Sequence, residues 1–295
     1  ADQCATKTAD KYVTYKKPTA VVQALNFPVS ASKKFVRVSG VGALNSEFST
    51  SFWLKSTSSG ADGRIISKSR SDGTGWNVRI SGGKIYFGGM ASADGNNNAA
   101  KFWGTPGVEV TTGVWHHVMA TFSKIGKISN LYLDGGNNGK PTTYDVLETG
   151  GNVALTQSTN PVIIGREWDE TDTTGWTSSN KNLAGGRKLY GVRLASIAMY
   201  DEVLVAEHAL ALFEGTTLPK DIGSSKIVAL VEGVRADGTI VDDSGKGTAT
   251  VKVLHKNDGS STSTDTKMDS VEDNSPTSEL ALVSSNLKTC GLSIN

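Results

Sequence analysis

The sequence lacks the features that mark membrane proteins and nucleic-acid-binding proteins. In its 295 residues there is no run that approaches the roughly eighteen consecutive apolar residues of a transmembrane helix. The 30 Lys and Arg residues are balanced by 29 Asp and Glu residues, so the formal net charge is only +1. Such a balance gives no strong overall field toward nucleic acid or an anionic membrane. We therefore expect a globular protein without a transmembrane segment and without a nucleic-acid partner.

Cysteine is scarce, and its two copies lie near the two ends of the chain. Cys4 and Cys290 are too far apart in sequence for a CxxC metal or redox motif. We expect them to form a disulfide, and the alternative is a pair of unrelated free thiols. The chain begins with Ala-Asp-Gln rather than Met, which fits removal of a signal peptide, although a trimmed chain would look the same. These features together predict a secreted protein, because disulfides persist in oxidising compartments.

Short β-favouring runs separated by turn signals fill the first 200 residues, and this spacing predicts an antiparallel β-sandwich. Ser81–Lys84 and Asp134–Asn137 carry the Gly and Asn residues that tight hairpins need. One helix is expected over Val205–Phe213, where the apolar residues fall on one face. The predicted strands are Phe35–Val38, Ser51–Lys55, Arg64–Lys68, Trp76–Ile80, Lys84–Phe87, Trp115–Phe122, Ser129–Asp134, Val162–Gly165 and Lys188–Tyr200.

The sequence changes character after Pro219. Two further strands are expected at Lys226–Glu232 and Thr248–Leu254. Residues Asn257–Pro276 are rich in Ser, Thr and Asp and nearly free of apolar side chains, so we expect a loop there. A last strand at Leu280–Val283 leads to Cys290, which suggests that this extension returns to the N-terminal segment.

The order of these segments resembles the laminin-G/pentraxin-like group of concanavalin-A-like β-sandwiches. The resemblance rests on these segments: Ala24–Phe27, Phe35–Val38, Phe48–Lys55, Gly113–Phe122 (against "GxWHHVAxTF"), Leu131–Gly135 (against "lYvDG"), Ile164–Arg166, Leu189–Tyr200 and Leu204–Phe213. The resemblance implies an all-β, concanavalin-A-like jelly roll with one short helix over residues 24–218. Residues 1–23 are then an N-terminal extension, and residues 219–295 are a β-rich C-terminal extension tied back by the disulfide.

The sequence departs from this family at its usual calcium site. Members often carry a carboxylate just after the first strand and another in a later strand. Here those places hold Pro28 and Val29, and Ser196. The resemblance therefore does not carry the family's calcium site over to this chain.

The histidines indicate structural roles. His116 and His117 are consecutive in a predicted strand, so their rings point to opposite faces and do not share a metal. His208 and His255 have no Cys or carboxylate at ligand spacing, so no zinc is expected.

Catalytic patterns are weak. Glycoside hydrolases need two carboxylates set close together, and the nearest imitation is Glu167-Trp-Asp169 in a predicted loop. A nucleophile elbow, a phosphate-binding loop and a dinucleotide fingerprint are all missing from the sequence. We expect a protein that is not an enzyme, and a polysaccharide lyase or glycoside hydrolase stays an alternative.

The segment 166–187 is longer than a hairpin needs, and it contains Arg166, Trp168 and Trp176. Long loops on a rigid scaffold are often functional, and tryptophans stack on sugar rings. We therefore predict ligand contacts there. The acidic residues of the same loop could instead be simply solvated, but calcium accepts such oxygen ligands. The candidate calcium ligands are Asp169, Glu170 and Asp172.

A second candidate site combines Asn97, in a turn rich in amides, with Trp103. Amide side chains hydrogen-bond sugar hydroxyls and aromatic faces offer a flat platform. Trp76 is added as a ligand-binding candidate, although a core position is equally open. Trp53 and Trp115 lie inside strand motifs and are expected in the core.

These observations predict a secreted, non-enzymatic β-sandwich that binds a glycan or an extracellular protein. The main alternative is a structural subunit of an extracellular filament, coat or virion that assembles through the C-terminal extension.

Overall fold

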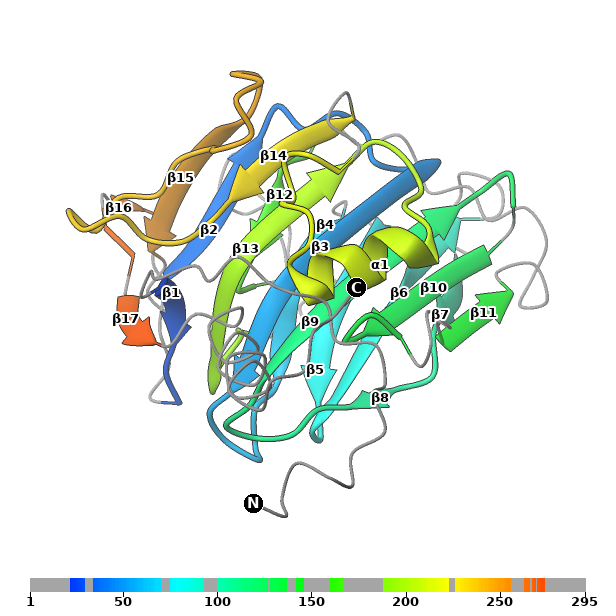
Figure 1. Cartoon of the computed structure of the whole chain (residues 1–295), viewed down its shortest axis with the longest axis horizontal. Coiled ribbons are helices and arrows are strands. Elements are labelled where there is room, and N and C mark those ends of the chain that lie inside the picture. Colours follow the sequence, from blue (N-terminus) through cyan, green and yellow to red (C-terminus); the bar gives the residue numbers. More distant parts are fainter. Residues whose placement is uncertain are drawn as a thin grey trace, which may run out of the picture.

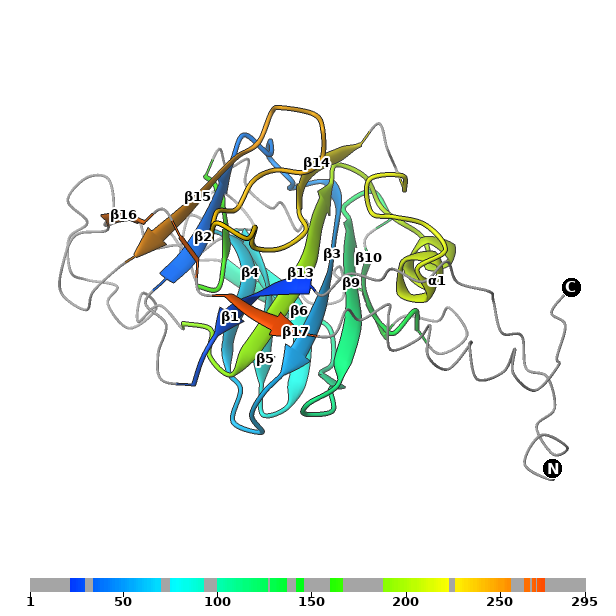
Figure 2. The ribbon, with the colours of Figure 1, turned by 60° about the vertical axis from the view of Figure 1, so that its left-hand side comes forward.

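The computed structural model describes residues 22–29, 34–69, 75–92, 100–126, 128–136, 142–145, 160–166, 188–222, 226–255, 263–265, 267–268 and 270–273. Two antiparallel sheets, called sheet A and sheet B below, pack face to face. One short helix lies outside sheet A (Figures 1 and 2). This is the β-sandwich that the sequence predicts.

Sheet A has the strand order β11-β10-β9-β3-β13-β1-β17, and β14 also pairs with β13. Its strands are β1 (Val22–Phe27), β3 (Glu47–Ser56), β9 (Trp115–Ser123), β10 (Ile128–Leu133), β11 (Thr142–Asp145), β13 (Val192–Tyr200), β14 (Ile227–Val231) and β17 (Ser270–Asp273).

Sheet B has the order β16-β15-β2-β12-β4-β5-β6-β7, with β8 pairing β6. Its strands are β2 (Lys34–Ser39), β4 (Gly63–Ser69), β5 (Gly75–Ser81), β6 (Lys84–Ser92), β7 (Ala100–Gly104), β8 (Val108–Glu109), β12 (Val162–Ile164), β15 (Thr250–His255) and β16 (Ser263–Asp265). The predicted strands match these elements, except that the 188–200 run begins its strand only at Val192.

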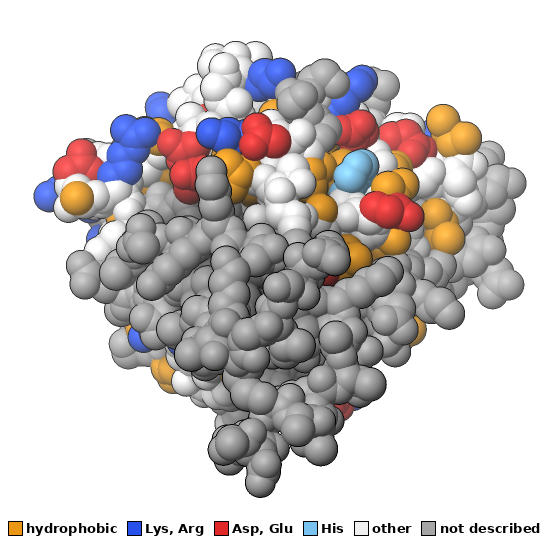
Figure 3. All heavy atoms as spheres, viewed as in Figure 1, with side chains coloured by type: hydrophobic (Ala, Val, Ile, Leu, Met, Phe, Trp, Pro, Cys, Tyr) orange, Lys and Arg blue, Asp and Glu red, His pale blue; other side chains and the backbone are white. Residues whose placement is uncertain are grey.

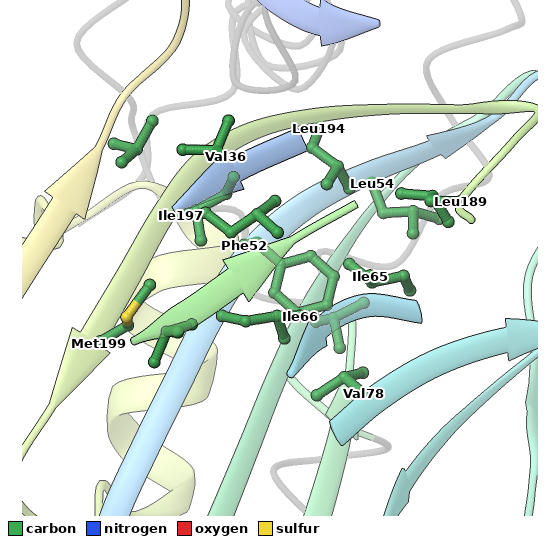
Figure 4. Packing of buried hydrophobic residues seen from close by; sticks show 14 of the residues in the cluster. Val36, Phe52, Leu54, Ile65, Ile66, Val78, Leu189, Leu194, Ile197 and Met199 are labelled. Atoms are coloured by element: carbon green, nitrogen blue, oxygen red, sulfur yellow. The ribbon is translucent and has the colours of Figure 1, made fainter. Parts of the chain in front are cut away.

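The main core lies between the two sheets. Phe52 and Leu194 of sheet A meet Val36, Ile66 and Val78 of sheet B, and all five side chains are fully buried (Figure 4). Alternate residues of each strand supply this layer, because successive side chains in a strand point to opposite faces.

The helix α1 (Ala206–Glu214) covers part of the outer face of sheet A, as Figure 2 shows. Beneath it, Ala209 and Leu212 join a second apolar cluster with Met119 and Tyr200 of the sheet. Gly215 ends the helix in the left-handed conformation that favours glycine. Every residue of β9 is buried, whereas β5 alternates between buried and half-buried residues. On sheet B, by contrast, the outward-facing residues of β5 stay partly accessible to solvent.

One hairpin fixes the geometry of that face. Gly82 and Gly83 have φ angles of 56° and 73°, which the two-residue turn between β5 and β6 requires. The turn sets the register Ser81↔Lys84, Ile80↔Ile85 and Arg79↔Tyr86.

The C-terminal extension is part of the sandwich wherever the structure describes it. β14 pairs with β13, β15 pairs with β2, and β17 pairs with β1. The predicted loop over 257–276 is wrong in two places, because β16 and β17 form there. Both are short edge strands held by backbone hydrogen bonds to one neighbour, so they form without the apolar side chains whose lack suggested a loop. Cys4, Cys290 and the strand expected at 280–283 lie outside the described residues, and the disulfide stays a prediction.

Candidate ligand-binding face

The outer face of sheet A does not present the aromatic residues of its central strands. Trp53 and Trp115 are 7% and 5% exposed and cluster with Ala24 and Ala195. The core position predicted for both tryptophans is confirmed.

The two neighbouring histidines lie on opposite faces of β9, as predicted. His117 is on the outer face, where its ring lies 5.3 Å from that of Trp53. His116 is buried on the other side and is held by hydrogen bonds to Thr111 and Asp134. Burial lowers the pKa of His117 to about 4, and Asp134 opposes this shift only in part. Neither ring is placed to bind a metal together with the other.

Sheet B carries a series of basic side chains on its outer face. We call these residues the basic strip: Arg37, Arg64, Arg79, Lys84 and Lys252. Their strands are neighbours or near neighbours in the sheet, and Lys252 pairs with Arg37 as Arg64 pairs with Arg79. In the described strands of this face, the one carboxylate is Glu109, whose Oε1 lies 3.4 Å from Nζ of Lys84.

Arg79 and Tyr86 form a stacked pair at the centre of the β5–β6 hairpin. The guanidinium carbon of Arg79 lies 4.6 Å from the centre of the Tyr86 ring. Gly107 supports this arrangement, because a Cβ there would come within 2.6 Å of the same ring. Stacking occupies the flat face of a guanidinium and leaves its N–H edge to bind planar anions or hydroxyl groups.

Arg64 lies beside this pair, directly opposite Arg79 in the strand register. Its Nη1 donates a hydrogen bond of 2.8 Å to Oδ1 of Asn77. Two arginines, an amide and a phenol are thus fixed on three adjacent strands, all of them half-buried. Donors on paired strands have less freedom than donors on loops, so these polar groups are held in a fixed arrangement.

Only some of the residues predicted as ligand contacts lie in the described part of the chain. Arg166 lies near this face, with its guanidinium carbon 5.5 Å from the centre of the Phe35 ring and its carbonyl accepting a hydrogen bond from Ser67. It is only 8% exposed. Trp103 belongs to β7, where its backbone pairs with Gly89. The following residues lie outside the described part of the chain: Asn97, Trp168, Asp169, Glu170, Asp172 and Trp176.

Trp76 is a core residue, which corrects its prediction as a ligand contact. Its side chain is 1% exposed and stacks on Phe48 at 4.7 Å between ring centres. The indole N–H donates to the carbonyl of Leu44 at 3.0 Å. The Gly-rich turn before it suggested a surface position, but the alternation of β5 places residues 76, 78 and 80 on the inner face.

Arg79 and Tyr86 were not among the predicted ligand contacts, although the sequence contains a signal that pairs them. A two-residue turn at 82–83 makes residues 79 and 86 cross-strand partners by counting alone. Counting along the sequence does not predict that Arg64 lies opposite Arg79, because the β4–β5 pairing contains an irregularity.

No group of three or more His, Cys, Asp or Glu residues that could hold a metal ion occurs in the described ranges. The calcium site at Asp169, Glu170 and Asp172 falls outside those ranges and stays a prediction. Within the same ranges, no helix has the length and apolar character needed to cross a membrane.

Comparison with known proteins identifies the family. Residues 30–206 match the family model described as the concanavalin A-like lectin/glucanases superfamily. No curated protein matches the chain significantly.

Solved structures add a likeness of fold. A "putative carbohydrate binding protein" from Bacteroides ovatus is 14% identical, with a TM-score of 0.50 over 88% of this chain, which spans 63% of that protein's length. A pentraxin from Limulus polyphemus is 16% identical, with a TM-score of 0.44 over 78% of this chain and 94% of its own. Domains LG4-5 of the mouse laminin alpha1 chain are 13% identical, with a TM-score of 0.44 over 68% of this chain and 48% of theirs.

Proposed function

Because the chain belongs to the concanavalin A-like lectin/glucanases superfamily, we propose that it is a secreted, non-enzymatic module that binds a carbohydrate on the outer face of sheet B. The observation that carries this proposal is the set of Arg64, Asn77, Arg79 and Tyr86 on three adjacent strands. Guanidinium, amide and phenol groups are suited to hydrogen-bond the hydroxyl and acidic groups of sugars.

The absence of an enzymatic role is also part of the proposal. Hydrolysis of a glycosidic bond commonly uses two carboxylates that flank the bond. On the described strands of this face, Glu109 is the one carboxylate, and Lys84 lies beside it. This arrangement supports binding rather than cleavage at this face.

The observation that favoured the alternative role, in filament or coat assembly, has another explanation. The strands of the C-terminal extension suggested contacts with neighbouring copies. In the structure, β14, β15 and β17 instead pair with β13, β2 and β1 of the same chain. Pairing within one chain therefore accounts for these strands.

The segment after Arg166, predicted from the sequence to be a loop, is the second part of the proposed ligand site. Trp168 and Trp176 stay predicted ligand contacts, with calcium predicted at Asp169, Glu170 and Asp172. Arg166, the last described residue before this segment, packs on Phe35 at the outer face of sheet B, which supports including both parts in one proposed site.

A glycan array with the purified full chain tests the proposed function. We expect binding to at least one glycan, and a loss of signal for Tyr86→Ala, which removes the ring under Arg79. Glu109→Gln is the matched control on the same face and should keep binding. A full chain that binds no glycan, or a Tyr86→Ala variant with unchanged binding, would contradict the proposal.

A further inference from the structure

We propose that the C-terminal segment, residues 274–295, lies over the outer face of sheet A and covers the two tryptophans there, held by a disulfide between Cys4 and Cys290. The covered surface, called the tryptophan face, consists of Ala24, Trp53, Trp115, His117 and Ala195. It lies on the other sheet from the proposed carbohydrate site, and the proposal does not depend on that site.

The tryptophan face is a continuous apolar surface that runs across four strands. Ala195 of β13 pairs with Trp53 of β3, and Trp53 pairs with His117 of β9. Trp115 stands two residues before His117 and therefore on the same face of β9. Ala24 of β1 packs in the same cluster. Two indoles and an imidazole thus stand beside two short alanine side chains, and a contiguous apolar surface of this kind commonly serves as a contact surface.

This face is buried, although the helix α1 reaches only one side of it. Trp53 and Trp115 are 7% and 5% exposed, and Ala24 has no exposed surface. Phe213 of α1 lies 6.0 Å from Trp53 between ring centres. The helix itself, however, lies beside β9 and β10 and does not extend to β1 (Figure 2). The cover over the rest of the face is therefore left to a further segment of the chain.

Two buried polar atoms indicate that this cover is a peptide segment. Nε1 of Trp115 and Nδ1 of His117 are buried, and within the described part of the chain neither has a hydrogen-bond partner. An unpaired buried polar atom costs stability, and a buried indole N–H usually finds an acceptor. A segment that crosses the face brings a carbonyl with every residue and an N–H with every residue except proline. It can therefore satisfy both atoms, which apolar side chains alone cannot.

The place where β17 ends selects the C-terminal segment. β17 ends at Asp273, three strands away from β3 and four from β9, or about 14 and 19 Å at the usual strand spacing. The apolar run Leu280–Val283 begins seven residues later, and seven residues span up to about 23 Å. Asn274, Ser275 and Pro276 lie between and favour a turn across the sheet, since proline has no N–H to continue the ladder of β17.

The two cysteines are placed to hold this segment. Val22 and Asp273 are register partners, so the two ends of the chain leave sheet A side by side. Cys4 lies 18 residues before Val22, and Cys290 lies 17 residues after Asp273. Arms of nearly equal length can meet at their cysteines, and the bond between the Sγ atoms then limits how far Leu280–Val283 can move from the face. Its formation removes two protons and two electrons from the thiols, and a disulfide oxidant accepts them and becomes a dithiol.

Hydroxyl-radical footprinting of the full chain, read by mass spectrometry, tests the proposal because it reports each tryptophan separately. In the original chain we expect Trp53 and Trp115 to be oxidised as slowly as the core residue Trp76. Leu280→Ser combined with Leu282→Ser removes apolar contacts of the segment and should raise the oxidation of Trp53 and Trp115 several-fold, with Trp76 unchanged. If this pair of changes also exposes Trp76, Leu282→Ala alone is the milder variant, with the same expected order.

A leucine outside the segment provides the matched control. Figure 3 shows apolar side chains of described residues at the surface on this side of the molecule. Leu218, just after α1, is 52% exposed, so Leu218→Ser should leave both tryptophans protected. Peptide mapping without reduction should recover Cys4 and Cys290 in one linked product. Cys4→Ser should raise the oxidation of the two tryptophans less than the leucine pair does, because the segment loses its anchor but keeps its apolar contacts.

Four results would overturn the proposal. Rapid oxidation of Trp53 and Trp115 in the original chain would show that the face is open. Protection that is lost in Tyr12→Ser with Val13→Ser, but kept in the leucine pair, would assign the cover to the N-terminal segment. Protection that disappears on dilution would assign it to a second copy of the chain. Alkylation of both thiols without prior reduction would exclude the disulfide anchor.

Discussion

Nδ1 of His116 lies 2.7 Å from Oδ2 of Asp134, so a side-chain contact joins β9 to the turn after β10. The backbone N–H of Thr111 donates to Nε2 of the same ring at 2.9 Å, so Nε2 is an acceptor and Nδ1 carries the proton that Asp134 accepts. Oδ1 of Asp134 accepts a further hydrogen bond from the backbone N–H of His117. One carboxylate therefore fixes both histidines of the pair.

The first prediction concerns Asp134. Asp134→Ala should lower the free energy of unfolding by about 2–4 kcal/mol, because it removes two hydrogen bonds to a charged acceptor and places alanine at a φ of 51°. Asp134→Asn keeps an acceptor and tolerates the left-handed conformation, so it should cost clearly less. Urea unfolding measures both, and equal losses for the two variants would disprove this role of Asp134.

The second prediction concerns pH and His117. Burial lowers its pKa in the folded protein to about 4, below the ordinary value of 6.5, so the unfolded chain binds the proton more tightly. The free energy of unfolding should then fall as pH drops from about 6.5 to about 4, by up to roughly 3 kcal/mol. Above pH 6.5 this contribution is fully present, since the ring is neutral in both states.

Replacement of the ring tests that assignment. His117→Phe keeps an aromatic group against Trp53 and should flatten the pH dependence of urea unfolding between about pH 4 and 6.5. His208→Gln, on α1, is the control and should keep the slope. An unchanged slope in His117→Phe would mean that other groups cause it.

The third prediction concerns Ser196, which has a φ of 52° within an irregularity of β13. Ser196→Gly should raise the free energy of unfolding by up to about 1 kcal/mol, because glycine adopts this conformation without a Cβ penalty. Ser196→Val should lower it, since β-branched residues tolerate this region least. Thermal unfolding of the two variants measures the difference, and the opposite order would show that the strain is elsewhere.

The fourth prediction separates Trp76 from the ligand. Trp76→Ala should cost about 3–5 kcal/mol of stability because it empties a buried aromatic site. The fraction that stays folded at low temperature should bind ligand normally. Tyr86→Ala should behave in the reverse way, with weaker binding and a smaller loss of stability. Calorimetry alongside urea unfolding distinguishes the two, and weakened binding by folded Trp76→Ala would return Trp76 to the ligand site.

Local patterns and the order of the family-like segments predicted the fold class and most of the strands. Trp115–Phe122 and Val205–Phe213 carry the hydrophobic periodicity of a strand and a helix, and the structure confirms both with shifts of one residue at most. The positive φ angles of Gly82 and Gly83 were foreseeable from the residue types. The correct predictions of strand, helix and turn depended on short stretches of neighbouring residues.

Pairing between distant segments was not predictable in this way. β16 and β17 form because their backbones meet the edges of β15 and β1, and no apolar pattern in their own sequences indicates it. The basic strip has the same origin: Arg37, Arg64 and Arg79 are scattered in sequence, and the strand order brings them onto one face of sheet B. The rest of the predicted site, from Trp168 to Trp176, lies outside the described residues.

The pairing of β1 with β17 has a consequence for biosynthesis. Val22 is the register partner of Asp273. On its other edge β1 pairs with β13, which also pairs with β14. Contacts between residues so far apart must close a loop of almost the whole chain, which costs entropy and slows folding. Until Asp273 has left the ribosome, the edge of β1 that pairs with β17 has no partner and is open to pairing with other chains. Chaperones that delay folding should therefore raise the yield of this protein more than they would for a sandwich whose strands pair in sequence order.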